Sequence, residues 1–359
     1  MPRAGPHDVT AGTAAGISRA ATMIDLRRYH EAAALLASIV AAAPDLPRAW
    51  CLLARAQLGA GRGADAVLAA RRAGALSPGD DWPWRLASTA LVSLGRGPEA
   101  VAAAQRARRL APGYWRPQVC VAQAAIAAGD PALAGEAARA ALAIAPHEAD
   151  VQFTAGKAAL AAGDLSRARG HQQAALAIDP GHAGAVNELG RISLRERDPG
   201  TAAGYFLRAA RAAPGVAVFG RNTEVALARL AIGLAVPAAG VLAVVLCLPV
   251  LTPVPLGPGL AMTAGLAALA GGYGWLVLRR LPADARRHLS RMVRRRQWLA
   301  AIGAVACLVP GLVAGVALLA AAPQAAARAA VPAAAVIAAV LAARLLVVWV
   351  IRHSRRMIR

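Results

Sequence analysis

Glycine, histidine and carboxylate residues recur along this chain in patterns that could bind phosphate or a metal ion. The run Gly59–Gly63 is rich in glycine, as are loops that cradle phosphate in front of a helix. No Lys-Ser or Lys-Thr pair follows it, and no strand pattern precedes it. His147 with Glu148, and His171 with His182, have neither an HExxH spacing nor a third ligand. We therefore expect no nucleotide or metal site, no cofactor and no acid/base catalysis.

The cysteines likewise show no pattern of a metal site. Cys51, Cys120, Cys247 and Cys307 form no CxxC pair and fall on positions with a helical pattern. This distribution is typical of small buried residues in a reducing compartment rather than of disulfides or a zinc site. We therefore expect the thiols to be structural.

The elements around these residues follow a regular proline register. Prolines recur every 34 residues, at Pro44, Pro78, Pro112, Pro146, Pro180 and Pro214. A unit of this length is a helix-turn-helix that cannot bury its apolar face alone and must stack on its neighbours. The first two thirds of the chain are therefore predicted to be an all-α repeat array.

Small residues keep the same spacing. If each proline is position 32 of a repeat, the repeats begin at Thr13, Pro47, Asp81, Trp115, Ala149 and Ala183. Position 20 is alanine in all six repeats, and position 27 is alanine in five, with Ile39 in the first. Gly61, Gly95, Gly129 and Gly163 recur between the two helices, where a permissive backbone ends the first helix. This pattern resembles the tetratricopeptide repeat (TPR) family over residues 13–216, which implies a right-handed helical solenoid.

The resemblance also implies a binding groove. The family points positions 2, 5, 9, 12 and 13 of each first helix into its concave face. The corresponding polar and aromatic residues are mainly basic, with Asp150 the acidic one: Arg48, Arg55, Trp82, Arg85, Arg116, Gln123, Lys157, Asn187, Arg191 and Arg195. Arginine forks bind carboxylates, so the expected ligand is an acidic or C-terminal peptide of a protein partner. The alternative is a solvated arginine-rich face without a ligand.

The last third of the chain has a different composition. The 359 residues are 58% hydrophobic but only 4% aromatic, which is too apolar for one soluble domain. The excess lies in four stretches of about 20 residues, each long enough to cross a bilayer as a helix, at 230–251, 259–278, 298–321 and 331–351. Residues 230–359 are therefore predicted to be a membrane domain with a four-helix bundle.

Arginine placement predicts the orientation of these spans. Of the 40 basic residues, 14 follow residue 229, against one of the 19 acidic residues. They gather in the loop 279–297 and in the C-terminal tail, which by the positive-inside rule face the cytoplasm together with the repeats. We therefore expect a multi-pass protein of the bacterial inner membrane.

The loop 279–297 has a second interpretation. Its arginines share a helical segment with apolar residues, so they could also contact anionic lipids at the membrane surface: Arg286, Arg287, Arg291, Arg294, Arg295 and Arg296. Stripes of glycine and alanine along the spans could pack a homo-oligomer or a membrane-protein partner.

The resulting domain organisation is a disordered segment over 1–12, six repeats over 13–216, a capping helix over 217–229 with an N-cap at Asn222 or Thr223, and the membrane domain. The function that it favours is a membrane-anchored scaffold or adaptor, not an enzyme. The alternative is an accessory subunit of a transport or secretion complex. The net charge of +21 is spread without the interleaved aromatic residues that stack bases, so nucleic acid is not an expected partner.

Overall fold

The structure is a computed structural model that describes residues 6–230 and residue 279, with side chains from residue 12 onward. The second, third and fourth predicted spans, all of the first except Leu230, and the basic loop except Arg279 lie outside the described residues. No helix among the described residues combines the length and apolar character that a membrane crossing requires.

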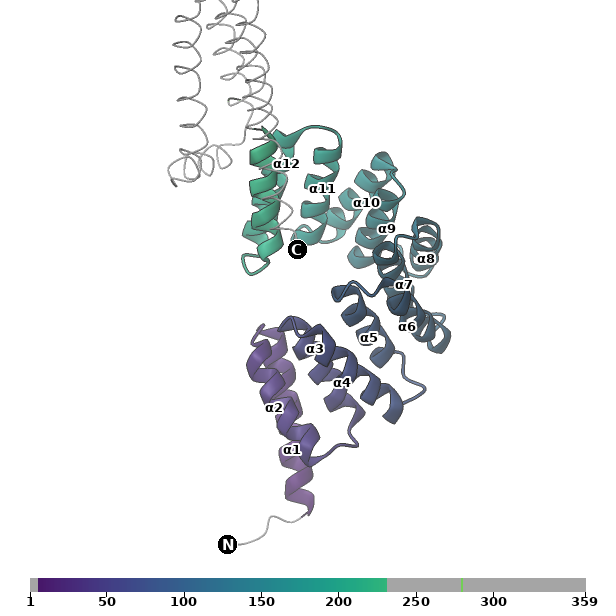
Figure 1. Cartoon of the computed structure of the whole chain (residues 1–359), viewed down its shortest axis with the longest axis vertical. Helices are drawn as coiled ribbons and strands as arrows, with labels where there is room; N and C mark the ends of the chain where they lie inside the picture. Colours follow the sequence, from purple (N-terminus) through teal and green to yellow (C-terminus); the bar gives the residue numbers. More distant parts are fainter. Residues whose placement is uncertain (1–5, 231–278, 280–359) are drawn as a thin grey trace, which may run out of the picture. The chain divides into compact units, whose positions relative to one another are not determined.

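The regular elements of the described residues are all helices, as predicted (Figure 1). They follow in the order α1 (Pro6–Asp25), α2 (Tyr29–Ala42), α3 (Pro47–Gly59), α4 (Gly63–Leu76), α5 (Trp82–Ser93), α6 (Gly97–Leu110), α7 (Trp115–Ala128), α8 (Pro131–Ile144), α9 (Ala149–Ala161), α10 (Leu165–Ile178), α11 (Ala183–Arg195) and α12 (Pro199–Ala212). Residues 217–230 are helical as well. Two compact units, divided between Ala185 and Val186, contain these helices.

The even-numbered helices begin at a constant interval of 34 residues, from Tyr29 to Pro199. The alanine at position 20 is fully buried in each repeat: Ala32, Ala66, Ala100, Ala134, Ala168 and Ala202. The alanines at position 27 are equally buried, whereas the larger Ile39 of the first repeat keeps 9% of its surface exposed. Small side chains at these two positions allow the helices to approach closely.

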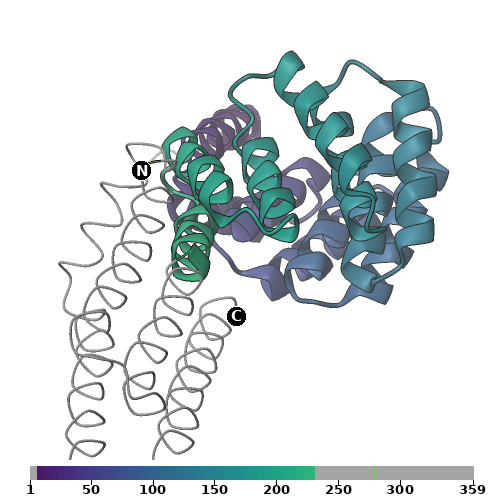
Figure 2. The same cartoon turned by 90° about the horizontal axis from the view of Figure 1, so that it is seen from above.

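One face of the first compact unit is formed by the first helices of its repeats. Successive first helices α1, α3, α5, α7 and α9 contact one another, whereas the second helices of the same residues make no contacts of similar extent with each other. The second helices α2, α4, α6 and α8 instead pack on the first helices of their own and the following repeat. Figure 2 shows the helical repeats from a second side. The row therefore bends with the first helices on its inner side, which we call the inner surface.

The turn between the two helices of a repeat depends on one backbone conformation. Gly61, Gly95, Gly129 and Gly163 have φ between +72° and +85°. The next amide closes the turn, as where Asp130 N donates to Ala125 O over 2.9 Å, which is a Schellman arrangement. The first and sixth repeats have Arg27 (φ 59°) and Arg197 (φ 63°) at the same position, with the same closing bond.

Two predicted boundaries differ from the structure. Residues 6–12 were expected to be disordered, but α1 begins at Pro6. Proline suits the first turn of a helix, and no second proline separates it from Thr13. The N-cap predicted at Asn222 or Thr223 is wrong, because both residues lie inside the helix 217–230. Thr223 is buried there, and its hydroxyl donates to the Phe219 carbonyl over 2.9 Å.

The left-handed arginines generate a stability prediction. We expect Arg27→Gly to raise the free energy of unfolding by about 1 kcal/mol, because a side chain with a Cβ is strained at this φ. Arg27→Ala is the matched control, since it removes the same guanidinium and keeps the Cβ. Urea unfolding of the full chain, followed by far-UV circular dichroism, measures both. Equal stability of the two variants would contradict the strain.

Candidate functional site

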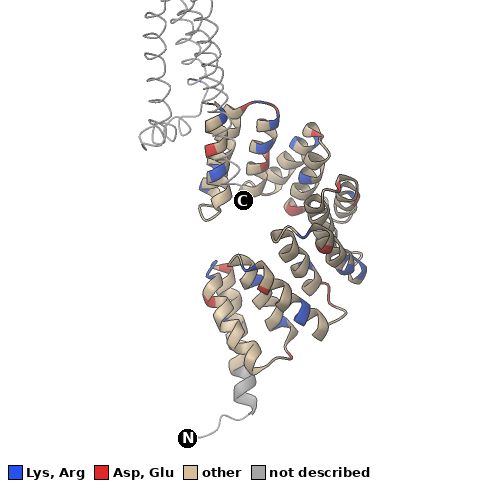
Figure 3. Cartoon of the chain, in the orientation of Figure 1, with Lys and Arg blue, Asp and Glu red and all other residues tan. Residues whose placement is uncertain are grey.

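The inner surface carries most of the residues predicted to bind a partner. Arg48 and Arg55 lie on α3, Trp82 and Arg85 on α5, Arg116 and Gln123 on α7, and Lys157 on α9. Asn187, Arg191 and Arg195 lie on α11 in the second compact unit. Figure 3 marks the charged residues of the described chain. Of these helices, α9 also has Asp150 and α11 has Glu188, whereas α3, α5 and α7 contain no acidic residue. The predicted residues therefore form two sets, one in each compact unit. Within each set, the charged groups differ in what they contact.

Several of the predicted arginines are already paired with acids of the same chain. Arg55 Nη2 lies 2.9 Å from Asp25 Oδ1. Arg85 Nε donates to Asp81 Oδ2 over 2.5 Å, and both side chains are more than four-fifths buried. The sequence analysis did not consider these partners. The Asp81 and Arg85 pair could have been found from its i,i+4 spacing on one helix, whereas Asp25 and Arg55 lie 30 residues apart.

In the second compact unit the same holds for α11. Arg191 Nη1 lies 2.8 Å from Glu188 Oε2, whose side chain is only 6% exposed. Asn187 is buried and accepts a hydrogen bond from Asn222 Nδ2 over 2.8 Å. The bond between Asn187 and Asn222 links α11 to the helix 217–230, whereas the Arg191 and Glu188 pair lies within α11. Much of the hydrogen-bonding capacity of these side chains is thus used inside the fold.

Arg116 has a different environment, made of aromatic rings. Its Cζ lies 4.7 Å from the ring centroid of Trp115 and 5.4 Å from that of Tyr114, and Nη1 donates to the Tyr114 hydroxyl. Arg85 approaches the same Tyr114 ring, with Cζ 5.8 Å from its centroid. Cation–π contacts of this kind fix the plane of a guanidinium while its outer edge stays exposed.

The next repeat places an acid beside this cluster. Asp150 stands 34 positions after Arg116, and its Oδ1 lies 3.4 Å from His182 Nε2. The His182 ring packs on Phe153 with centroids 4.7 Å apart, and Lys157 Nζ lies 5.5 Å from the Phe153 centroid. His182 was not among the predicted binding residues, because His171 and His182 have neither an HExxH spacing nor a third ligand in the sequence. No local spacing indicates its partner Asp150, which lies 32 positions away.

This pair shifts the titration of both groups. The hydrogen bond to Asp150 raises the pKa of His182 above its ordinary value near 6.5, against an opposing effect of burial. The same bond lowers the pKa of Asp150, to which the positive charge of Arg116 also contributes. Asp150 and His182 therefore attract each other as a charged pair where the pH lies between the lowered pKa of Asp150 and the raised pKa of His182.

The described thiols are in an environment that makes them unreactive. Burial raises the pKa of Cys51 to about 12 and that of Cys120 to about 11. Both are free cysteines, and Cys247 and Cys307 lie outside the described residues. Because the thiolate is the nucleophile, neither described cysteine suits covalent chemistry. Over the same residues, no group of three His, Cys, Asp or Glu side chains could hold a metal ion.

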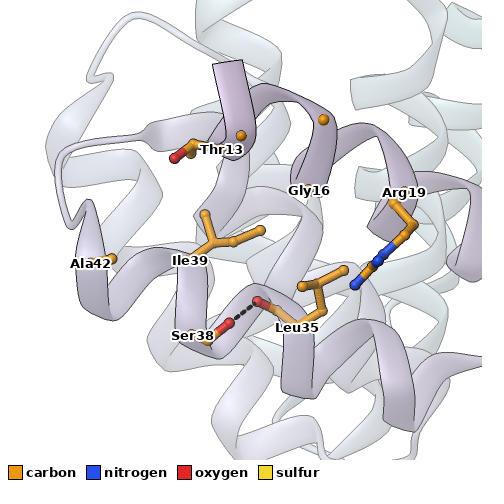
Figure 4. A pocket seen from close by; sticks show the side chains of 9 residues that line it. Thr13, Gly16, Arg19, Leu35, Ser38, Ile39 and Ala42 are labelled. Atoms are coloured by element: carbon orange, nitrogen blue, oxygen red, sulfur yellow. Dashed lines mark hydrogen bonds between the residues drawn. The ribbon is translucent and has the colours of Figure 1, made fainter. Parts of the chain in front are cut away.

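A depression of about 450 Å³ lies between α1 and α2 (Figure 4). Its lining consists of small and apolar residues such as Gly16, Leu35 and Ile39, with Arg19 as the charged member. Ser38 also lines it, and its hydroxyl donates to the Leu35 carbonyl over 2.8 Å. This lining offers no nucleophile with an adjacent base, so the depression has none of the arrangement of a catalytic site.

Comparison with known proteins gives the fold. No family model matches the chain, and no curated protein matches it. A tetratricopeptide repeat protein from Parabacteroides merdae superposes with a TM-score of 0.55 at 12% identity, over 62% of this chain and 86% of that one. A chain of the APC/C hetero-tetramer Cut9–Hcn1 superposes with a TM-score of 0.50 at 16% identity, over 60% of this chain and 43% of that one. The described chain has the tetratricopeptide repeat fold.

The TPR resemblance of the sequence is thus confirmed at the level of the fold. A TPR protein from Thermus thermophilus is also similar, at 21% identity and a TM-score of 0.47, over 51% of this chain and 99% of that one. Identities this low describe architecture and do not transfer a ligand or a partner.

The Asp150 and His182 pair generates a pH prediction. We expect Asp150→Asn to lower the pKa of His182, because the carboxylate that favours the imidazolium is lost while the burial remains. In the unchanged protein, the contribution of His182 to stability is present below about pH 6.5 and is lost as pH rises through its raised pKa. The contribution of Asp150 is lost as pH falls through its lowered pKa.

Nuclear magnetic resonance of the full chain with ¹³C-labelled histidine measures the His182 titration directly. Asp65→Asn, which removes an exposed carboxylate on α4, is the control and should leave it unchanged. An unchanged His182 titration in Asp150→Asn would show that the pair does not form.

Proposed function

We propose that this chain is a membrane-attached TPR scaffold that binds a segment of a protein partner on its inner surface. The observation that supports this most is the set of polar, charged and aromatic side chains on α3, α5, α7 and α9, described above, on a surface built from successive first helices. A solenoid of this kind provides an extended concave surface rather than a pocket. Catalysis is not part of the proposal. Over the described residues, burial raises the pKa of both thiols, and no group of three His, Cys, Asp or Glu side chains could hold a metal ion.

The solved neighbours are consistent with a role in assembly. The Cut9–Hcn1 structure is a hetero-tetramer in which a chain with this fold takes part in a complex. For the present chain, we propose a protein segment or acidic peptide as the partner, with binding energy from exposed arginine and aromatic side chains. Arg48 and Arg116 are exposed, and Trp82 and Gln123 are half-buried, so each can present surface to such a segment.

Attachment to the membrane is proposed from the sequence alone. The four apolar stretches after residue 229 are long enough to span a bilayer, and arginines gather between the second and the third and after the fourth. The proposal places the repeats, the loop 279–297 and the C-terminus on the cytoplasmic side of a bacterial inner membrane. The arginines of that loop then lie at the lipid surface, and the small-residue faces of the spans are available to a second copy or to a membrane protein.

In-cell crosslinking tests partner binding. A photoreactive amino acid at Gln123, on the inner surface, is expected to capture a defined protein, because the bound segment lies across α7. The matched control is the same amino acid at Glu136 on α8, a second helix with an exposed side chain. Mass spectrometry then identifies the captured protein. Equal capture from both positions, or none from Gln123, would contradict the proposal, and capture of a transport or secretion component would favour the accessory-subunit alternative.

Extraction from cells tests membrane attachment. We expect the full chain to stay in the membrane pellet after treatment with alkaline carbonate, because spanning helices resist a treatment that releases peripheral proteins. A chain that ends at Arg229 should be released, and protease added to inverted membrane vesicles should digest the repeats of the full chain. Release of the full chain by carbonate would exclude spanning helices.

A further inference from the structure

The basic groups of the inner surface are not equally able to receive an acidic ligand. Arg55 and Arg85 are engaged with Asp25 and Asp81. Lys157 stacks on Phe153 and takes part in further interactions. Arg116 is bonded to a neutral hydroxyl and stacked on two rings, and among the described residues no carboxylate lies within ion-pair distance of it. An incoming acid would displace a carboxylate at Arg55 or Arg85, but at Arg116 it meets only the neutral Tyr114 hydroxyl. Arg48 is exposed as well, but none of the described aromatic rings orients its guanidinium as Tyr114 and Trp115 orient that of Arg116.

We propose that Arg116 is the carboxylate receptor of the inner surface, and that the neighbouring Asp150 and His182 pair makes capture of the carboxylate stronger as the pH falls below neutral. This inference rests on the proposed function, in which the inner surface binds a segment of a partner. The ligand is a glutamate, an aspartate or a C-terminal carboxylate of that segment.

The aromatic contacts of Arg116 prepare it for this role. A free arginine side chain loses rotational freedom about several bonds when it binds an acid, which costs about 0.5–1.5 kcal/mol per side chain. The rings of Tyr114 and Trp115, together with the hydrogen bond to the Tyr114 hydroxyl, already restrict Arg116 in the absence of a ligand. The planar guanidinium then presents its remaining N–H donors to the two oxygens of a carboxylate.

The surroundings favour a carboxylate over a phosphate. A phosphoryl group with nearly two negative charges is bound best by several arginines at once. Arg85 shares the Tyr114 ring with Arg116, but its Nε is bonded to Asp81. Of these two guanidinium groups, only that of Arg116 is therefore available to a ligand. Asp150 adds a negative charge nearby, and its repulsion is larger for a dianion than for a single carboxylate. The site therefore fits one monovalent acid.

The pH dependence follows from the charges around Asp150. His182 approaches it from the turn that follows α10, and Asp179 in the same segment also acts on His182. Arg116 faces Asp150 from α7, and Lys157 lies on α9, the helix of Asp150. When His182 is neutral, Asp150 repels an arriving carboxylate. When His182 is protonated, its charge offsets that of Asp150, so the affinity of Arg116 for the carboxylate rises.

Blocked pentapeptides bound to the full chain test the site. The probe peptide has glutamate at its centre with serine and alanine around it. Two matched peptides have glutamine or phosphoserine in place of the glutamate. A further peptide has central glutamine and a free C-terminal carboxylate, which distinguishes side-chain from terminal acids. The readout is the Nε–Hε resonances of ¹⁵N-labelled arginine, with the Arg116 signal assigned from its loss in Arg116→Ala.

We expect glutamate to bind at least about fivefold more tightly than glutamine, because only glutamate offers a charge-assisted pair. Arg116→Ala should abolish this preference, whereas Arg55→Ala, which removes a paired arginine of the same surface, should preserve it. Affinity for glutamate should rise by about twofold from about pH 8 to about pH 6, since one charge is offset at short range. Asp150→Asn should bind at about pH 8 as the unchanged chain does at about pH 6.

Three results would overturn the inference: a glutamate preference that survives Arg116→Ala, a phosphoserine peptide that binds more tightly than the glutamate peptide, or an affinity independent of pH. These outcomes are separable from failure of the proposed function. If crosslinking from Gln123 still captures the partner in Arg116→Ala, the scaffold role stands and the carboxylate receptor does not. If nothing is captured from the inner surface of the unchanged chain, the scaffold role itself fails.

Discussion

The close approach of the two helices within each repeat is the constraint on which the rest of the fold depends. A Cβ on Gly190 would lie 2.6 Å from the Phe206 ring, and one on Gly156 would lie 2.3 Å from Gln172 Nε2. In the second and fourth repeats the first helix instead has alanine at this position and the second helix has alanine opposite it, in the pairs Ala54 with Ala70 and Ala122 with Ala138. A glycine on the first helix thus lies opposite a large residue on the second, whereas elsewhere two alanines share the space. The space between the helices is filled in both cases, as close packing requires.

This constraint also arranges the candidate site. Because each repeat packs in the same way, side chains 34 residues apart occupy equivalent places on neighbouring first helices. Arg116 and Asp150 are such a pair, and Trp82 is the equivalent residue one repeat earlier. The inner surface is thus a row of equivalent positions in which aromatic, basic and acidic residues alternate. Its binding properties depend on the few residues that differ between repeats, because the backbone beneath them is nearly the same.

The sequence predicted what is periodic and missed much of what is not. The helical repeat, the buried alanines and the glycine turns recur every 34 residues, so each repeat supports the interpretation of the others. The start of α1 and the helix around Thr223 lie at the ends of the array, where no neighbouring repeat defines the register. The pairs of Asp25 with Arg55 and of Asp150 with His182 join residues about 30 positions apart, and no local spacing indicates them. The predicted spans lie outside the described residues, so their arrangement stays a prediction.

Internal pairing changes how the charge of the chain should be interpreted. A net charge of +21 suggests a surface that attracts any anion, yet Arg55, Arg85 and Arg191 are each engaged by a carboxylate of the same chain. An exposed pair such as Arg55 with Asp25 contributes only about 0–1 kcal/mol to stability. The larger effect of these pairs is on recognition, because an acid that must displace Asp25 or Asp81 gains less than one that meets Arg116. The internal pairing of Arg55 and Arg85 therefore makes the inner surface more selective than its total charge would allow.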